Sequence, residues 1–239
     1  MPHARSISPS STPLHTGLWQ EAPRDAHWQI IAALGGGLAL DAVWGWPGQV
    51  AADLWVLAVF AWLWREGGDL EKRAMLVCLV IASLGEAFLS LAWGLYDYQF
   101  NNIPLFVPLG HALLMTLGII GARHAPGWAV WLVPAAAVPY VAAGWWQGWD
   151  TLGALLFLIF LVCLLKGKAS SLYVTMFVLS LLLELYGTAL GNWTWRPLVP
   201  WLHWSNTNPP LCSGAFYCVL DLLVLAGMKA GMRNAAANA

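Results

Sequence analysis

The sequence predicts an all-α integral membrane protein with about eight transmembrane helices, arranged as two pseudo-symmetric four-helix halves. Hydrophobic residues make up 59% of the chain and charged residues only 10%, which leaves too little polar surface for a soluble domain. Apolar runs near the roughly 20 residues that cross a bilayer recur along the chain. A motif built around one glutamate occurs once in each half, which is typical of duplicated membrane proteins.

The apolar runs define the expected helices in chain order. Those of the first half, residues 28–121, and of the second half, residues 126–228, are 28–47, 50–65, 73–95, 103–121, 126–146, 149–166, 170–191 and 208–228. The second and sixth are short, and Pro134 and Pro139 are expected to kink the fifth. Residues 1–27 and 229–239 are expected to be cytoplasmic tails, since they contain no long apolar run and residues 1–27 lack the apolar core of a signal peptide.

The positions of lysine and arginine predict that both termini lie on the cytoplasmic side, the N-in/C-in arrangement. With the N-terminus inside, only Arg196 falls on the outer side. The other ten basic residues fall on the cytoplasmic side: Arg5, Arg24, Arg65, Lys72, Arg73, Arg123, Lys166, Lys168, Lys229 and Arg233. In a bacterium this predicts a protein of the inner (plasma) membrane whose repeated motifs face the periplasm.

The repeated motif places a glutamate in an apolar run, followed by G-x-aromatic-x-aromatic and then N-x-P-L. The first copy is Glu86, Gly94-Leu-Tyr96-Asp-Tyr98 and Asn102-Ile-Pro-Leu105. The second copy is Glu184, Gly191-Asn-Trp193-Thr-Trp195 and Asn208-Pro-Pro-Leu211. The spacing from glutamate to glycine is one residue longer in the first copy. Four helices in each half predict repeats of the same orientation, related by an axis along the membrane normal.

Few ionisable residues fall within the expected spans, and each costs roughly 2.5–3.5 kcal/mol on insertion scales when central. Asp41, Glu86, His111 and Glu184 are expected near the outer half, where they can converge, whereas Asp221 is expected deeper. An acid in an apolar pocket can donate a proton to a substrate. The alternative is that each glutamate only hydrogen-bonds a neighbouring helix. His111 breaks the repeat, because Ala215 or Phe216 stands roughly at its place in the second half.

Tryptophan is unusually frequent, with 17 residues. Ten are expected on the outer side: Trp44, Trp46, Trp93, Trp145, Trp146, Trp149, Trp193, Trp195, Trp201 and Trp204. They fit either an interfacial aromatic belt or an aromatic cavity for a long apolar or cationic ligand. The four cysteines form no C-x-x-C pair and are expected to be buried thiols.

Two blocks of the sequence resemble a known family. The first runs from Glu86 through Gly94-x-Tyr96-x-Tyr98 to Ile103-Pro-Leu-Phe-Val-Pro108-Leu, and the second joins Gly191-Asn-Trp193-Thr-Trp195 to Pro210-Leu-Cys-Ser-Gly-Ala-Phe216. Both are similar to the carotenoid biosynthesis membrane protein family, which includes carotenoid 1,2-hydratases. The chain departs from that family at His111, where a tryptophan is usual, and at Leu183-Glu184-Leu185-Tyr186, where the family is rich in aspartate.

The resemblance implies an integral membrane enzyme that adds water to a C=C bond of an isoprenoid or carotenoid-like lipid, a hydratase of the lyase class. Glu86 or Glu184 would be the acid, the other carboxylate or Asp41 would hold water, and His111 would relay a proton. The expected substrate-binding residues are Tyr96, Tyr98, Asn102, Trp193, Trp195 and Asn208. No metal or redox cofactor is needed for this chemistry, and no nucleic-acid partner is expected. The alternatives are a proton-coupled transporter or lipid-binding membrane protein, and a structural subunit of a larger complex.

Overall fold

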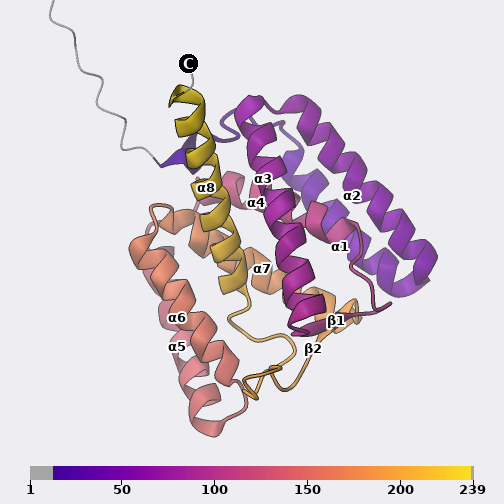
Figure 1. Cartoon of the computed structure of the whole chain (residues 1–239), viewed down its shortest axis with the longest axis vertical. Coiled ribbons are helices and arrows are strands. Elements are labelled where there is room, and N and C mark those ends of the chain that lie inside the picture. Colours follow the sequence, from indigo (N-terminus) through magenta and orange to yellow (C-terminus); the bar gives the residue numbers. More distant parts are fainter. Residues whose placement is uncertain (1–12, 238–239) are drawn as a thin grey trace, which may run out of the picture.

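A computed structural model describes residues 13–237 and contains eight α-helices joined by short connections (Figure 1). They are α1 (Ala26–Trp44), α2 (Trp46–Glu66), α3 (Asp69–Glu86), α4 (Phe106–Ala122), α5 (Ala129–Gln147), α6 (Thr151–Lys166), α7 (Ser170–Leu190) and α8 (Gly214–Ala237). Each lies over one of the expected apolar runs. The all-helical prediction is therefore confirmed.

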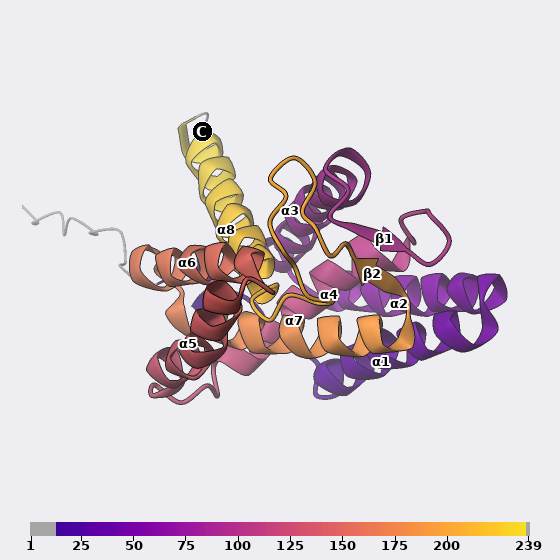
Figure 2. The same ribbon diagram turned by 90° about the horizontal axis from the view of Figure 1, so that it is seen from below.

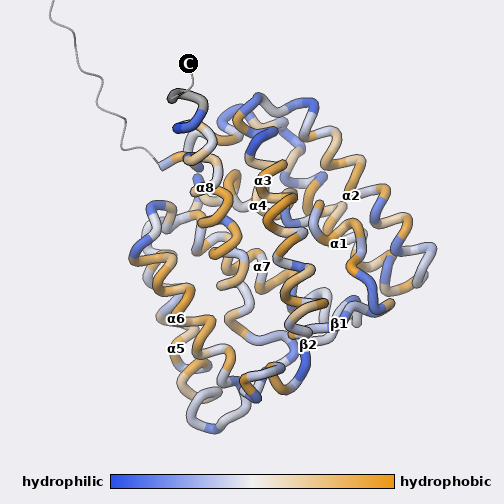
Figure 3. Tube along the Cα trace, viewed as in Figure 1, coloured by the Kyte–Doolittle hydropathy of each residue, from blue (hydrophilic) through white to orange (hydrophobic). Residues whose placement is uncertain are grey.

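Several helices have the length and composition of membrane spans. Among the described residues, five stretches are long and apolar enough to cross a bilayer: α2, α3 with its extension to Ala92, α5, α7 and the part of α8 up to Asn234. The helices α4 and α6 are shorter but also apolar. Hydrophobic residues follow the helices, and hydrophilic residues gather at their ends and in the connections (Figure 3). The chain thus has the character of an integral membrane protein, while eight crossings stay a prediction.

Four helices form a central ring that holds the site. In this ring α3 packs against α4 and α8, and α7 packs against the same two helices (Figure 1). The pair α1–α2 packs on α4, with α1 also reaching α7, and the pair α5–α6 packs on α7, with α6 also reaching α8 (Figure 2). Side chains that point inward from the ring therefore come from both copies of the repeated motif.

Directly after Glu86, α3 widens into a π-helix, η2 (Ala87–Ala92). The Trp93 N–H donates to the Phe88 carbonyl, five residues back, at 2.7 Å. A π-turn accommodates one more residue than an α-turn. It therefore accounts for the one-residue difference between the two copies, because α7 stays α-helical and ends at Gly191 in the left-handed conformation (φ +82°).

The two aromatic motifs pair with each other. The strands β1 (Tyr96–Tyr98) and β2 (Trp193–Trp195) form an antiparallel ribbon in which Asp97 lies opposite Thr194. Successive side chains of a strand point to opposite faces, so the four aromatic residues share the buried face while Asp97 and Thr194 are exposed. This pairing joins segments far apart in the chain, and it closes one end of the central ring.

The ends of the chain differ from the expected tails. Residues 1–12 lie outside the described residues, but Leu18 and Trp19 are buried. The Trp19 N–H donates to Glu71 at 2.9 Å, and the Arg123 guanidinium donates to the Leu18 and Trp19 carbonyls. These contacts fix residues 13–25 against α3 and α4.

The last helix also differs from the expected span 208–228. It begins at Gly214, after a segment that contains Pro209 and Pro210, which lack the N–H group of a helical residue. It continues to Ala237 through Lys229 and Arg233, so residues 229–237 extend α8. In contrast, α5 runs as one α-helix through Pro134 and Pro139.

Candidate active site

The carboxyl group of Glu86 lies at the centre of the first copy of the motif. Its Oε2 atom accepts hydrogen bonds from the hydroxyl groups of Tyr96 at 2.8 Å and Tyr98 at 2.6 Å. Burial, and after it the Glu86 carboxylate, raises the pKa of both hydroxyls well above its usual value. Both tyrosines therefore remain O–H donors at neutral pH, and the G-x-Y-x-Y spacing is explained by two donors that reach one oxygen.

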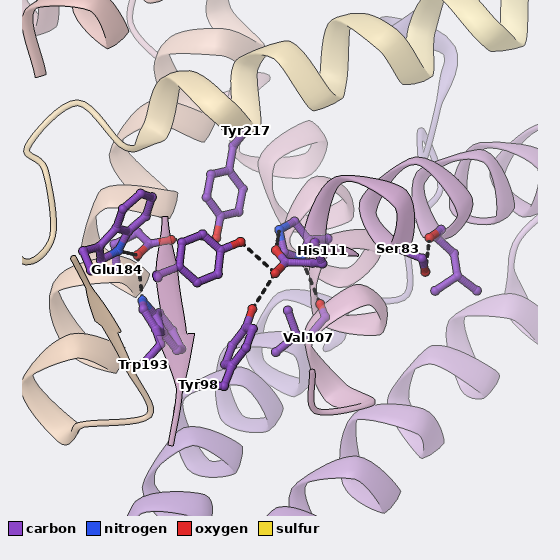
Figure 4. Close-up of polar contacts among 11 residues, drawn as sticks. Ser83, Tyr98, Val107, His111, Glu184, Trp193 and Tyr217 are labelled. Atoms are coloured by element: carbon purple, nitrogen blue, oxygen red, sulfur yellow. Dashed lines mark hydrogen bonds and ion pairs between the residues drawn. The ribbon is translucent and has the colours of Figure 1, made fainter. Parts of the chain in front are cut away.

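The imidazole of His111 completes the Glu86 cluster. Its Nε2 atom lies 3.4 Å from Glu86 Oε1, and its Nδ1 atom lies 2.9 Å from the Val107 carbonyl (Figure 4). A carbonyl only accepts hydrogen bonds, so Nδ1 carries a hydrogen. The Nε2 atom then faces Glu86 as the nitrogen that can gain or lose a proton.

The second copy is built in the same way around Glu184. Its Oε2 atom accepts from the indole N–H groups of Trp193 at 2.9 Å and Trp195 at 3.0 Å. Its Oε1 atom accepts from the Tyr217 hydroxyl at 3.1 Å. Gly187, one turn after Glu184, makes this possible because a Cβ atom there would lie 2.0 Å from the Trp193 ring. The carboxylate thus has three donors, two of which cannot accept a proton in return.

The two clusters meet at a pair of stacked rings. The His111 and Tyr217 rings are parallel within 6°, with centroids 5.0 Å apart, as the labelled side chains in Figure 4 show, and both line the cavities that Glu86 and Glu184 also line. Tyr217, rather than Ala215 or Phe216, occupies the place that corresponds to His111. The sequence contained this signal, because Tyr217 follows Asn208 at the same spacing as His111 follows Asn102.

Two cavities open from this polar centre. The larger, about 220 Å³, lies between α3 with η2 and α8, and the smaller, about 50 Å³, lies between α1, α4 and α7. The residues that line both are Glu86, Tyr96, His111, Glu184, Trp195 and Tyr217. Tyr98 and Trp193 line the smaller cavity only. The structure therefore gathers seven of the expected site residues around one space.

Three expected site residues lie outside both cavities. Asp41 accepts hydrogen bonds from Asn192 at 2.7 Å and Gln49 at 3.4 Å. Asn102 donates to Gln49 at 2.9 Å. Asn208 accepts from the Trp195 backbone N–H at 2.9 Å. Asp41, Asn102 and Asn208 thus fix the loops and the ribbon around the site, without facing the space between the glutamates.

The tryptophans divide between the two expected roles. Trp193 and Trp195 are buried at the site, whereas five of the outer-side group are exposed: Trp44, Trp46, Trp145, Trp146 and Trp201. Exposed indole rings at helix ends are typical of an interfacial belt. All four cysteines are buried and free, as expected. Within residues 13–237, no group of three or more His, Cys, Asp or Glu side chains is placed to hold a metal ion.

Comparisons of the chain with protein-family models, with curated proteins and with solved structures found no match. The inference of function therefore rests on the geometry of the site.

Proposed function

We propose that the protein is an integral membrane enzyme that adds water to a C=C bond of an isoprenoid or carotenoid-like lipid by acid catalysis. One observation carries the proposal: two buried carboxyl groups, each held by a pair of aromatic hydrogen-bond donors, face a common aromatic space that joins two apolar cavities. A protonated alkene needs an acid, a counter-charge for the carbocation and π-faces around it. These three requirements match the groups around this space.

We also propose the membrane arrangement expected from the sequence. All eight helices would cross the inner membrane of a bacterium, with both termini in the cytoplasm and the β1–β2 ribbon on the outer side. The packing of α3 and α7 against the same two helices is consistent with two related halves. The basic residues Arg65, Lys72, Arg123, Lys166 and Lys229 lie at the opposite helix ends from the ribbon in chain order, as the positive-inside rule requires.

Glu86 is the proposed acid. Its Oε2 atom accepts from two hydroxyl groups, which remain hydrogen-bonded whether the carboxyl group is neutral or charged, and its Oε1 atom faces the imidazole Nε2. Loss of the proton to a substrate carbon leaves a carboxylate that the Tyr96 and Tyr98 hydroxyls stabilise. His111 can return a proton through Nε2, because its Nδ1 hydrogen is held by Val107.

Glu184 is the proposed counter-charge. Its Oε2 atom accepts from two indole N–H groups, which stabilise the anionic form. A carboxylate in an apolar surrounding acts strongly on a nearby positive charge. The ring faces of Tyr96, Trp195 and Tyr217 line the same space and add cation–π attraction.

The proposed reaction balances without an oxidant or reductant. The π-electron pair of the alkene takes the Glu86 proton, which forms a C–H bond and a carbocation on the neighbouring carbon. Water forms the C–O bond to that carbon, and its surplus proton returns to the Glu86 carboxylate, directly or through His111. The product is an alcohol, and the acid is restored.

A proton-coupled lipid carrier is the second candidate, and Asp221 is the observation that favours it. Its side chain is fully buried, and neither carboxyl oxygen has a hydrogen-bond partner among the described residues. It lies one helical turn beyond Tyr217 on α8. Buried acids spaced along a membrane protein are typical of proton pathways.

Isotope labelling separates the two candidates. Purified protein in liposomes would be incubated with lycopene or γ-carotene in H₂¹⁸O, with Glu86→Gln as the matched variant. The enzyme is expected to form an alcohol that carries ¹⁸O by mass spectrometry, and Glu86→Gln is expected to form none. Unchanged polyenes, together with their movement across the membrane driven by a pH gradient, would favour the carrier. Equal turnover by Glu86→Gln would remove the proposed acid.

A further inference from the structure

The two cavities at the polar centre differ in what closes them. The smaller cavity ends against α1 and α2, where Ala33, Leu34 and Val56 are buried. The larger cavity ends between η2 and α8, where Phe88 is 50% exposed and Leu223 is 46% exposed. In a bilayer, these two side chains contact lipid. The smaller cavity is thus bounded at this end by buried side chains and is named the closed cavity, whereas the larger cavity is open to the membrane.

The open cavity coincides with the π-helix. Its lining residues on this side are Ile81, Gly85, Phe88, Leu89, Val219 and Leu223. Phe88 and Leu89 belong to η2, a π-helix with one residue more than the corresponding part of the second copy, which is a regular α-helix. Gly85 adds room, because a Cβ atom at this position would meet nothing within 4 Å. The mouth therefore depends on a local feature of the first copy alone.

The closed cavity limits how much of a chain it holds. A volume of about 50 Å³ has room for roughly four water-sized groups, at about 10–15 Å³ each. This is the size of one branched end of an isoprenoid chain. A longer segment would have to remain in the larger cavity and, beyond it, in the bilayer.

We infer that a linear isoprenoid chain enters from the bilayer between η2 and α8 and inserts end-first, so that its terminal unit occupies the closed cavity beneath α1. The inference rests on the proposed function and specifies how the chain is oriented in the site. The branch methyl groups of the terminal unit then lie in the closed cavity and the double bond of the same unit lies between Glu86 and Glu184, while the rest of the chain leaves through the mouth.

Photo-crosslinking tests this orientation without turnover. Two probes would be used in liposomes: geranylgeraniol with a diazirine on its terminal isoprenoid unit, and geranylgeraniol with a diazirine beside its hydroxyl group. The terminal probe is expected to label peptides that contain Leu34 or Leu114, and the second probe peptides that contain Phe88 or Leu223. The reverse pattern, or labelling of neither cavity, would overturn the inference.

Matched variants sharpen the test. Gly85→Phe places a ring in the mouth, whereas Gly35→Phe places the same ring on α1 at a position that also has open space but lines neither cavity. Labelling by both probes is expected to fall at least tenfold in Gly85→Phe and to stay unchanged in Gly35→Phe. Unchanged labelling in a Gly85→Phe protein that elutes as wild type in gel filtration would contradict the route.

A third variant covers the case in which Gly85→Phe does not fold. Gly110→Val fills the closed cavity, where a Cβ atom would lie 3.2 Å from Leu34 Cδ2. The terminal probe is then expected to lose its label on α1, while the hydroxyl-end probe keeps its label at the mouth. If the probes label the expected peptides but no alcohol forms, the proposed hydration is refuted and the inferred binding mode stands. If alcohol forms but the expected peptides are not labelled, the binding mode is refuted and the hydration stands.

Discussion

The Glu86 side and the Glu184 side of the site follow one plan with different chemistry. On each side, one carboxyl oxygen accepts from both aromatic residues of its own strand, and a ring from the following long helix approaches the other oxygen. The Glu86 donors are phenol hydroxyls, and the third group beside Glu86 is an imidazole whose Nε2 atom can accept a proton. The strand donors to Glu184 are indoles, which cannot.

The backbone differs between the two sides as well. The Glu86 side contains the π-helix η2, whereas the Glu184 side has a regular helix whose Gly187 lies under the Trp193 ring. The duplicated geometry therefore fixes where the two acids meet, while donor type and one extra residue make the surroundings of each acid different.

The largest expected effect separates the two acids. Glu86→Gln removes the proposed proton donor and should lower the rate of alcohol formation by roughly 10²–10⁴-fold, the usual contribution of a general acid. Glu184→Gln removes a counter-charge and should cost about 10²–10³-fold. Single-turnover rates in liposomes measure both. A larger loss in Glu184→Gln than in Glu86→Gln would contradict the assignment of Glu86 as the acid.

The stacked rings give the next comparison. His111→Phe removes the proton relay and should lower turnover by a smaller factor than Glu86→Gln, because water can still return its proton to Glu86 directly. Tyr217→Phe leaves this relay in place, removes one of three donors to Glu184 and should cost less than His111→Phe. Single-turnover rates in liposomes measure both variants. A larger loss in Tyr217→Phe than in His111→Phe would contradict the assignment.

Alanine substitutions of one glycine on α7 and one on α3 should change the stability of the protein in opposite directions. Gly187→Ala should destabilise the protein by about 1–3 kcal/mol, because the new methyl group overlaps the Trp193 ring. Gly85→Ala meets open space and should stabilise its helix by roughly 0.5–1 kcal/mol. Thermal unfolding in detergent, followed by tryptophan fluorescence, reports both changes. If Gly187→Ala left the stability unchanged, the Trp193 ring could move away from Glu184 without a loss of folding free energy.

Alkaline pH should weaken the Glu86 side through both of its tyrosines. The folded pKa values of Tyr96 and Tyr98 lie well above the usual value because of burial and the Glu86 carboxylate. The unfolded chain therefore releases these protons first, and stability falls as pH rises above about 10, by at most about 1.4 kcal/mol per tyrosine and pH unit. Tyr96→Phe and Tyr98→Phe should each reduce this slope in unfolding experiments between pH 9 and 11, a range centred on about 10. Trp193→Phe, which removes no titrating group, should leave the slope unchanged.

The smallest expected effect concerns the exposed face of the ribbon. Arg196 donates twice to Asp97, from Nε and Nη2, at 3.0 Å each. Both side chains are half exposed, so the pair should contribute about 0.2–1 kcal/mol. A double-mutant cycle of Asp97→Ala and Arg196→Ala measures it. A larger coupling would indicate that the ribbon opens as a unit.

Local patterns in the sequence were sufficient to predict where the helices lie and to single out the two buried glutamates. Apolar length placed the eight helices, and the repeat singled out Glu86 and Glu184. The pairing of β1 with β2 was not predicted, because strand register depends on contacts between segments far apart in the chain. Tyr217 was missed because the counterpart of His111 was placed one or two residues early, at Ala215 or Phe216, although nine residues counted from Asn208, as from Asn102 to His111, lead to Tyr217. Asp41 was expected at the site because only its expected depth in the membrane was considered. Its hydrogen bond from Asn192, which holds the carboxylate away from the space between the glutamates, depends on the tertiary structure.

The π-helix after Glu86 also bears on how the chain tolerates change. A π-turn contains one residue more than the α-turn that could replace it, so its deletion would be absorbed locally by a regular helix. Glu86 and Gly94 would keep their places on either side, and the first copy would acquire the spacing of the second. A single codon thus separates the first copy, whose π-helix lines the larger cavity, from the spacing of the second copy, whose helix is regular. One insertion or deletion would therefore be enough to convert either form of the backbone into the other.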